Sequence, residues 1–218
     1  MAHRAFAAFS AVCLLTLGAL SGCGAGSVNG RVTVGAGQKA GDVASVNGAV
    51  TVEDGASVDS VANVNGAVSL GSKVTAGSVK TVNGRVKIGD AAHVSGGVLS
   101  VNGAVILENA AEVDGRVTSV NGAITLTAAH IGGGIKTVNG AIDVGAGSRV
   151  EGGIYVEKPG GMNPVSNEVR VVIGPNAVVS GGMKFERPVK LYVSDSAQIN
   201  GPVEGAEATK FSGDQPPN

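Results

Sequence analysis

Val28-Asn29-Gly30 is the first of seven copies of one tripeptide in this chain. The other copies are Val46-Asn47-Gly48, Val64-Asn65-Gly66, Val82-Asn83-Gly84, Val101-Asn102-Gly103, Val120-Asn121-Gly122 and Val138-Asn139-Gly140. Successive valines are 18, 18, 18, 19, 19 and 18 residues apart. A fixed period of this size predicts stacked supersecondary units instead of one globular core.

Each period contains three short apolar segments. The first follows the tripeptide and alternates with period two, as in Val50-Thr51-Val52, the pattern of a half-buried strand. A second alternation follows, as in Ala92-His93-Val94, and a third apolar position such as Val98 precedes the next tripeptide. The segments leave no room for helices, and coiling would place each strand on its own copy one period later. The chain is therefore predicted to be all-β, a single-stranded parallel β-helix (β-solenoid) of triangular section with about nine turns of 18–19 residues.

The tripeptide then has a predicted structural role. Each asparagine falls at the same corner, so successive side chains should stack and hydrogen-bond along the axis, as amide ladders do in stacked parallel strands. The predicted ladder is Asn29, Asn47, Asn65, Asn83, Asn102, Asn121 and Asn139. The glycine after each asparagine is expected to permit the bend. The alternative is a row of ligand-binding asparagines on the surface.

The first residues have the pattern of a secretory signal. His3 and Arg4 precede an apolar run that ends at Leu20, too short for a comfortable membrane span. The run leads into Leu20-Ser21-Gly22-Cys23, which resembles a bacterial lipobox. That resemblance implies cleavage before Cys23 and acylation of its sulfur, and Gly24 after the cysteine resembles the outer-membrane sorting pattern of Gram-negative bacteria. The alternative is an ordinary signal peptide with an incidental cysteine.

These patterns divide the chain into four parts. We expect a lipoprotein signal peptide at 1–22, a lipidated cysteine and short tether at 23–27, a parallel β-helix at 28–205, and a C-terminal cap with a mobile tail at 206–218. One turn is longer than the others, because Val150 and its counterpart Val179 are 29 residues apart. The prolines and glycines of this turn predict a loop insertion near 157–168.

Composition limits the function classes. Removing residues 1–22 takes Arg4 from the 16 basic residues, so 15 face 17 acidic ones and no basic surface for nucleic acid is expected. No cysteine pair remains for a disulfide, since Cys13 lies in the signal and Cys23 is the predicted lipid site. No aromatic residue occurs between Gly24 and Glu151, so the lumen should be narrow. Phe185, Tyr192 and Phe211 are expected to close its far end.

Catalytic chemistry has little support in the sequence. Hexapeptide acyltransferases also use triangular β-helices, but they need a histidine base beside a substrate groove. His93 and His130 are two turns apart, ~10 Å along the rod, and are expected to face solvent. No histidine, cysteine or carboxylate cluster has metal-ligand spacing. We therefore predict no enzyme activity, no cofactor, and no catalytic, cofactor-binding or metal residues.

The segment Val171–Met183 resembles one turn of a bactofilin, and the short aliphatic strands and glycine-bearing corners over 28–205 are similar in kind. Bactofilins are polymer-forming bacterial cytoskeletal proteins built as triangular parallel β-helices that join end to end. The resemblance implies the same architecture and self-association through the ends.

The expected function is that of a membrane-anchored structural or scaffold lipoprotein of the bacterial cell envelope. Its expected partner is the lipid bilayer, through acylated Cys23. A surface adhesin or a glycan- or protein-binding module is the alternative, and a bactofilin-like polymer is the second. Sugars stack on aromatic rings, and the repeat has no row of them, which favours a scaffold. A protein or glycan partner is left open by the sequence.

Overall fold

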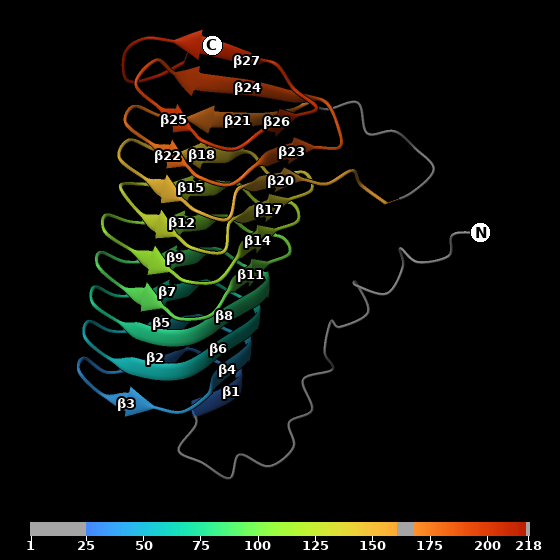
Figure 1. The fold of residues 1–218 in the computed structure, drawn as a ribbon. Coiled ribbons are helices and arrows are strands. Elements are labelled where there is room, and N and C mark those ends of the chain that lie inside the picture. The colour runs from blue at the N-terminus through green and yellow to red at the C-terminus, as the bar shows by residue number, and fades with distance from the viewer. Residues whose placement is uncertain (1–24, 161–167, 217–218) are drawn as a thin grey trace.

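The computed structural model describes residues 25–160 and 168–216, which form a rod of stacked coils (Figure 1). Every regular element in these two ranges is a β-strand. The coils follow one another along the rod from β1 at one end to β27 at the other (Figure 1). The predicted signal peptide and Cys23 lie outside the described residues.

Each turn except the last contributes a strand to each of three faces, which confirms the predicted β-helix. Face 1 holds β1 (Ala25–Asn29), β4 (Val43–Asn47), β11 (Val98–Ser100), β14 (Val117–Ser119), β17 (Ile135–Thr137), β20 (Ile154–Val156), β23 (Met183–Phe185) and β26 (Val203–Glu204). Face 2 holds β2 (Val32–Val34), β5 (Val50–Val52), β7 (Val68–Leu70), β9 (Val86–Ile88), β12 (Val105–Leu107), β15 (Ile124–Leu126), β18 (Ile142–Val144), β21 (Val169–Ile173), β24 (Val189–Ser194) and β27 (Ala208–Phe211). Face 3 holds β3 (Lys39–Ala40), β10 (His93–Val94), β13 (Glu112–Val113), β16 (His130–Ile131), β19 (Arg149–Val150), β22 (Val178–Val179) and β25 (Gln198–Ile199). Two longer strands, β6 (Ser57–Asn65) and β8 (Thr75–Asn83), continue from face 3 onto face 1.

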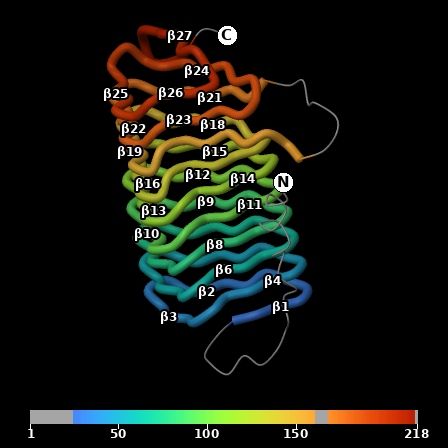
Figure 2. Tube along the Cα trace, turned by 45° about the vertical axis from the view of Figure 1, so that its right-hand side comes forward, coloured from blue at the N-terminus to red at the C-terminus, as the bar shows by residue number. Residues whose placement is uncertain are grey.

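Strands pair in parallel with their copies one turn later, as predicted (Figure 2). On face 2 Val32 lies beside Val50, and Val50 beside Val68, so like residues stack along the rod. Face 2 has ten strands, one more than the nine turns expected, because Ala208–Phe211 pairs with β24. The strands of the coil therefore run from Ala25 to Phe211, beyond both ends of the predicted 28–205.

Aliphatic side chains fill the lumen, as the alternation predicts. Val50 and Val52 are fully buried, whereas Thr51 between them points outward and is half-buried. Among the described residues before Met183, every buried hydrophobic residue is Val, Leu, Ile or Ala. Burial of each Val, Leu or Ile is worth about 1.5–3 kcal/mol, so the stacked aliphatic rows supply most of the stabilisation.

The three aromatic residues expected to close the lumen do not all do so. Phe185 on β23 and Phe211 on β27 are buried, with 5% and 6% of their surfaces exposed. Tyr192 lies between inward-pointing Leu191 and Val193 and therefore points outward, since side chains alternate along a strand. The prediction for Tyr192 was wrong.

The insertion leaves the coil at the corner between faces 1 and 2. In a regular turn four residues, 101–104, separate β11 from β12, whereas twelve, 157–168, separate β20 from β21. Residues 161–167 of the predicted loop lie outside the described residues. The insertion replaces the tripeptide corner of this turn, so the asparagine row ends at Asn139.

Candidate functional site

The feature that distinguishes this rod is the corner between faces 1 and 2, which holds all seven tripeptides and is called here the asparagine corner. Its asparagine side chains form one hydrogen-bonded row. Six hydrogen bonds of 2.7–3.1 Å join the seven residues, and in each the Nδ2 donates to the Oδ1 of the asparagine one turn before it, in the order Asn139, Asn121, Asn102, Asn83, Asn65, Asn47 and Asn29. The amides all point the same way, so each bond polarises the next.

The glycines of the corner are required for space. A Cβ on Gly84 would lie 1.8 Å from the carbonyl oxygen of Gly66, and one on Gly103 would lie 1.9 Å from that of Gly84. Real Cβ atoms are never this close to backbone. Successive turns of the corner therefore stack backbone on backbone, which brings the asparagine amides within hydrogen-bonding distance. The sequence predicted a bend at these glycines, whereas close packing between turns is the stronger constraint.

A second polar row lines the inside of the same corner. The residue before each of six tripeptides is polar and buried: Ser45, Asn63, Thr81, Ser100, Ser119 and Thr137. Most of these side chains bond to corner glycine backbone. For example, Ser100 Oγ donates to Gly103 O over 2.9 Å, and Ser119 Oγ accepts from Gly122 N over 3.0 Å.

The hydrophobic pattern did not predict this inner row, although Ser, Thr or Asn precedes every tripeptide. The tripeptide valines lie partly exposed on the outside, with Val28 49% exposed.

Arg187 closes the oxygen end of the asparagine row. It stands at the corner of the ninth turn, between β23 and β24, and its side chain extends past the turn that carries the insertion. Its Nη1 donates to Asn139 Oδ1 over 2.5 Å and to Val138 O over 2.7 Å. Only 7% of Arg187 is exposed. A cation therefore sits at the negative end of the aligned amides, where its charge is favourable.

Charged groups surround the point where the insertion begins. The Tyr155 hydroxyl donates to the Glu186 carboxylate, and this bond, with burial and nearby carboxylates, raises the pKa of Tyr155 to about 12. The same bond lowers the pKa of Glu186. Lys136 Nζ lies 5.6 Å from the Tyr155 ring centroid and 2.9 Å from Glu157 Oε2. These contacts join side chains on the outer surface of face 1, close to Asn139 at the end of the asparagine row.

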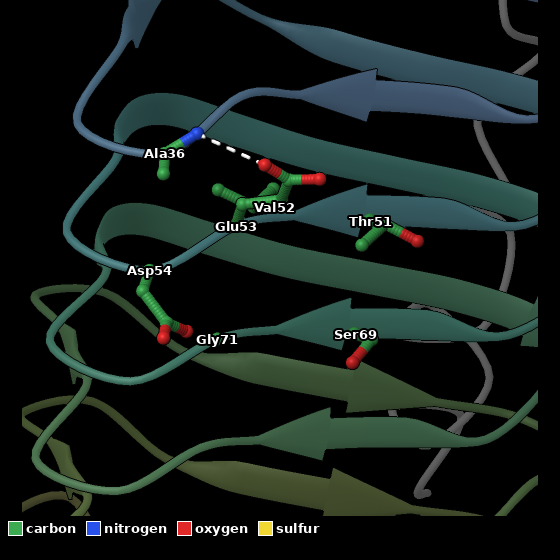
Figure 3. A pocket seen from close by; sticks show the side chains of 7 residues that line it. All are labelled: Ala36, Thr51, Val52, Glu53, Asp54, Ser69 and Gly71. Carbon is green, nitrogen blue, oxygen red and sulfur yellow. Dashed lines mark hydrogen bonds between the residues drawn. The ribbon is translucent and has the colours of Figure 1, made fainter.

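The surface depressions are shallow. One of about 320 Å³ lies across the first three turns of face 2, where Thr51 and Ser69 come from neighbouring strands (Figure 3). The Ala36 amide at its edge already donates to Glu53 Oε2 over 3.1 Å (Figure 3). A second, of about 400 Å³, lies farther along face 2 and is bordered by Asp214, Gln215 and Pro216 of the C-terminal segment. Asp143 is exposed, but partial desolvation by the walls of this second depression raises the pKa of its carboxyl, and the charge of Arg170 opposes that shift.

The predicted site residues fall into two groups. The seven asparagines lie together at the corner just described, while the predicted lipidation site, Cys23, lies outside the described residues. His93 and His130, expected to face solvent, lie on the outer side of face 3 with 41% and 36% of their side chains exposed.

Comparisons of the chain with protein-family models, with curated proteins and with solved structures found no match. Residues 25–160 and 168–216 contain no helix long and apolar enough to cross a bilayer.

Proposed function

We propose that this protein is a structural rod of the bacterial cell envelope, anchored in a membrane by acylated Cys23. Supporting observations are the length and regularity of the coil. Ten strands stack on face 2, and nine steps of ~4.8 Å make the rod roughly 43 Å long. The stacked aliphatic lumen and the amide row run along this axis, so the molecule suits the role of a stiff spacer.

The observation that carries the proposal is the position of the first coil. β1 begins at Ala25, two residues after Cys23, and forms the first turn at one end of the rod (Figure 1). Two residues span at most ~7 Å, so an acyl group on Cys23 would hold that end of the rod against the bilayer. Val28, the most exposed large hydrophobic residue among those described, lies in the same turn.

A glycan-binding adhesin has less support. Among the described residues, the aromatic side chains that are not buried are Tyr155 and Tyr192. Lys136 lies over the Tyr155 ring, and the Arg170 guanidinium lies 5.4 Å from the Tyr192 ring centroid. Each ring therefore already has a cation on one face, and the two rings stand on different faces of the rod. They do not form the row on which a sugar chain would stack.

A bactofilin-like polymer would form through the ends of the rod. β2 pairs on one side with β5, and β27 pairs on one side with β24, so both ends present a strand with one free edge. Such edges recruit other chains unless they are covered. We propose that the membrane covers the first edge and that the C-terminal segment limits association at the last.

Membrane fractionation tests the anchor. Full-length protein, expressed with its signal in a bacterium, should remain with membranes after a high-salt wash, and its mass should show cleavage before Cys23 and acylation. Cys23→Ser should release the protein, because a serine oxygen cannot form the thioether. Cys13→Ser is the matched control, since it changes the other cysteine and should leave the anchor intact. Retention of Cys23→Ser on washed membranes would overturn the proposal.

A further inference from the structure

The coil brings together histidine and acidic side chains that are far apart in sequence. On face 3 Glu112 lies in register between His93 on one side and His130 on the other. Asp114 and Glu151 extend from the ends of β13 and β19 on the same face. All five side chains point outward and are between 36% and 50% exposed.

The distances within this group resemble those between ligands of one metal ion. The ligand atoms of His93, Glu112 and Asp114 all lie within 4.8 Å of one another. His93 Nε2 lies 3.0 Å from Asp114 Oδ2. A tetrahedral zinc ion with bonds near 2.1 Å keeps its ligand atoms about 3.4 Å apart. Small rotations of these exposed side chains would therefore suffice to bind an ion.

His130 contacts Glu112 from the side opposite to His93. Its Nδ1 lies 3.2 Å from Glu112 Oε1, so it contacts one of the two oxygens of that carboxylate. Its Nε2 lies 3.1 Å from Glu151 Oε1, without the alignment of a hydrogen bond. Ionised carboxylates can only accept hydrogen bonds, and several of them close together are favoured by positive charge nearby.

Arg149 lies in register beside His130, but lysine and arginine form no ion pair with the carboxylates of this group. Elsewhere on the rod carboxylates pair with lysine, as Glu108 does with Lys87 over 2.9 Å and Glu157 with Lys136. In the described ranges no lysine or arginine nitrogen comes within 4.0 Å of the carboxylates of Glu112, Asp114 or Glu151. These three acids have only imidazole partners.

We propose that His93, Glu112 and Asp114 form a surface binding site for a divalent transition metal ion such as Zn²⁺, with His130 positioning Glu112. A mixed set of one imidazole and two carboxylates suits such an ion, whereas Ca²⁺ and Mg²⁺ prefer oxygen ligands alone. The strands on which these residues stand are locked in register, so the site is built on rigid elements. The site is independent of the anchor at the end of the rod.

Calorimetric titration with ZnCl₂ tests the site. Full-length protein in detergent, stripped with EDTA, should bind one Zn²⁺ per chain. Affinity should fall at least about tenfold in His93→Gln and in Asp114→Asn, since loss of even an outer partner of a metal site costs this much. Glu108→Gln is the matched control. It removes a carboxylate beside face 2, away from the proposed site, and should bind Zn²⁺ as the wild type does.

Circular dichroism and melting temperature verify that each variant is folded. If His93→Gln does not fold, Asp114→Asn provides the test. A folded wild-type protein that binds no Zn²⁺ at 1 mM ZnCl₂ would overturn the proposal. Equal affinity in the wild type and both site variants would also overturn it, because the bound ion would then lie elsewhere.

Discussion

Arg187 offers the sharpest test of how the asparagine row ends. Replacing it by methionine keeps an unbranched apolar stem but removes the guanidinium. Asn139 Oδ1 and Val138 O would each lose a charged donor. If the row needs a cation at its oxygen end, this change should destabilise the turns on both sides of the insertion.

The expected magnitude follows from the two bonds. A hydrogen bond from a charged donor is worth about 1.5–3 kcal/mol. Water can replace the lost donor only poorly, because 7% of Arg187 is exposed. Methionine also avoids the cost of burying a charge, which offsets part of the loss. We therefore expect the lower end for the sum, a decrease of about 3 kcal/mol in the free energy of unfolding.

Urea unfolding followed by circular dichroism measures this change in Arg187→Met, Asn139→Ala and the double variant. The coupling energy of this cycle should be about 1.5 kcal/mol, the share of the Arg187–Asn139 bond. Lys184→Met is the control, since it removes an exposed cation from the same turn and should cost less than about 0.5 kcal/mol. A coupling energy below about 0.5 kcal/mol would refute the proposed closure of the row.

Three further predictions concern the core, the charged surface and the last strand. Val105 is fully buried, so Val105→Asp should lower the free energy of unfolding by at least about 3 kcal/mol. Thr125→Asp, on the outer side of face 2, should lower it by less than about 1 kcal/mol. Similar shifts in melting temperature for the two variants would contradict the assignment of inward and outward positions. Because the pKa of Tyr155 rises from 10.0 to about 12, its contribution to stability is complete below pH 10 and is lost as pH rises to 12. Tyrosinate absorbance, with the other tyrosine changed to phenylalanine, should show that midpoint and a lower one in Glu186→Gln; an unchanged midpoint would count against the bond. Deleting residues 206–218 replaces the four-residue edge strand β27 by the six-residue strand β24, a longer edge, so the shortened Cys23→Ser protein should associate end to end in sedimentation more than the intact-tail form. Filaments from the intact-tail form would favour the polymer.

The strands could be predicted because a solenoid repeats its own pattern. Val50-Thr51-Val52 recurs in kind after each tripeptide, and parallel coiling is the arrangement that stacks such copies on one another. The period therefore determined the register, and the alternation determined which side chains fill the lumen. One exception was Tyr192. We expected it to close the lumen because it is aromatic, although its position between inward-pointing Leu191 and Val193 places it on the outer side.

The parts that escaped prediction depend on contacts that no local pattern encodes. Hydrophobic alternation gives no place to buried polar residues such as Ser100, which are satisfied by backbone of the corner itself. Arg187 is not part of the repeated pattern and lies 48 residues from Asn139, so the repeat does not predict their contact. His93 and Asp114 are 21 residues apart, and only the coil turns that separation into 3.0 Å.

The asparagine corner also makes the rod adjustable in length. A segment such as 48–65 starts and stops at equivalent points of consecutive turns, and each turn contacts mainly its neighbours. Duplicating that segment would add one corner glycine, one buried polar residue of the inner row and one asparagine of the hydrogen-bonded row, without altering either terminus. Deleting it would remove the same set. Each event would change the reach of the molecule by ~4.8 Å. Duplication or loss of one repeat would thus change the length of the rod in even steps, with no redesign of the remaining turns.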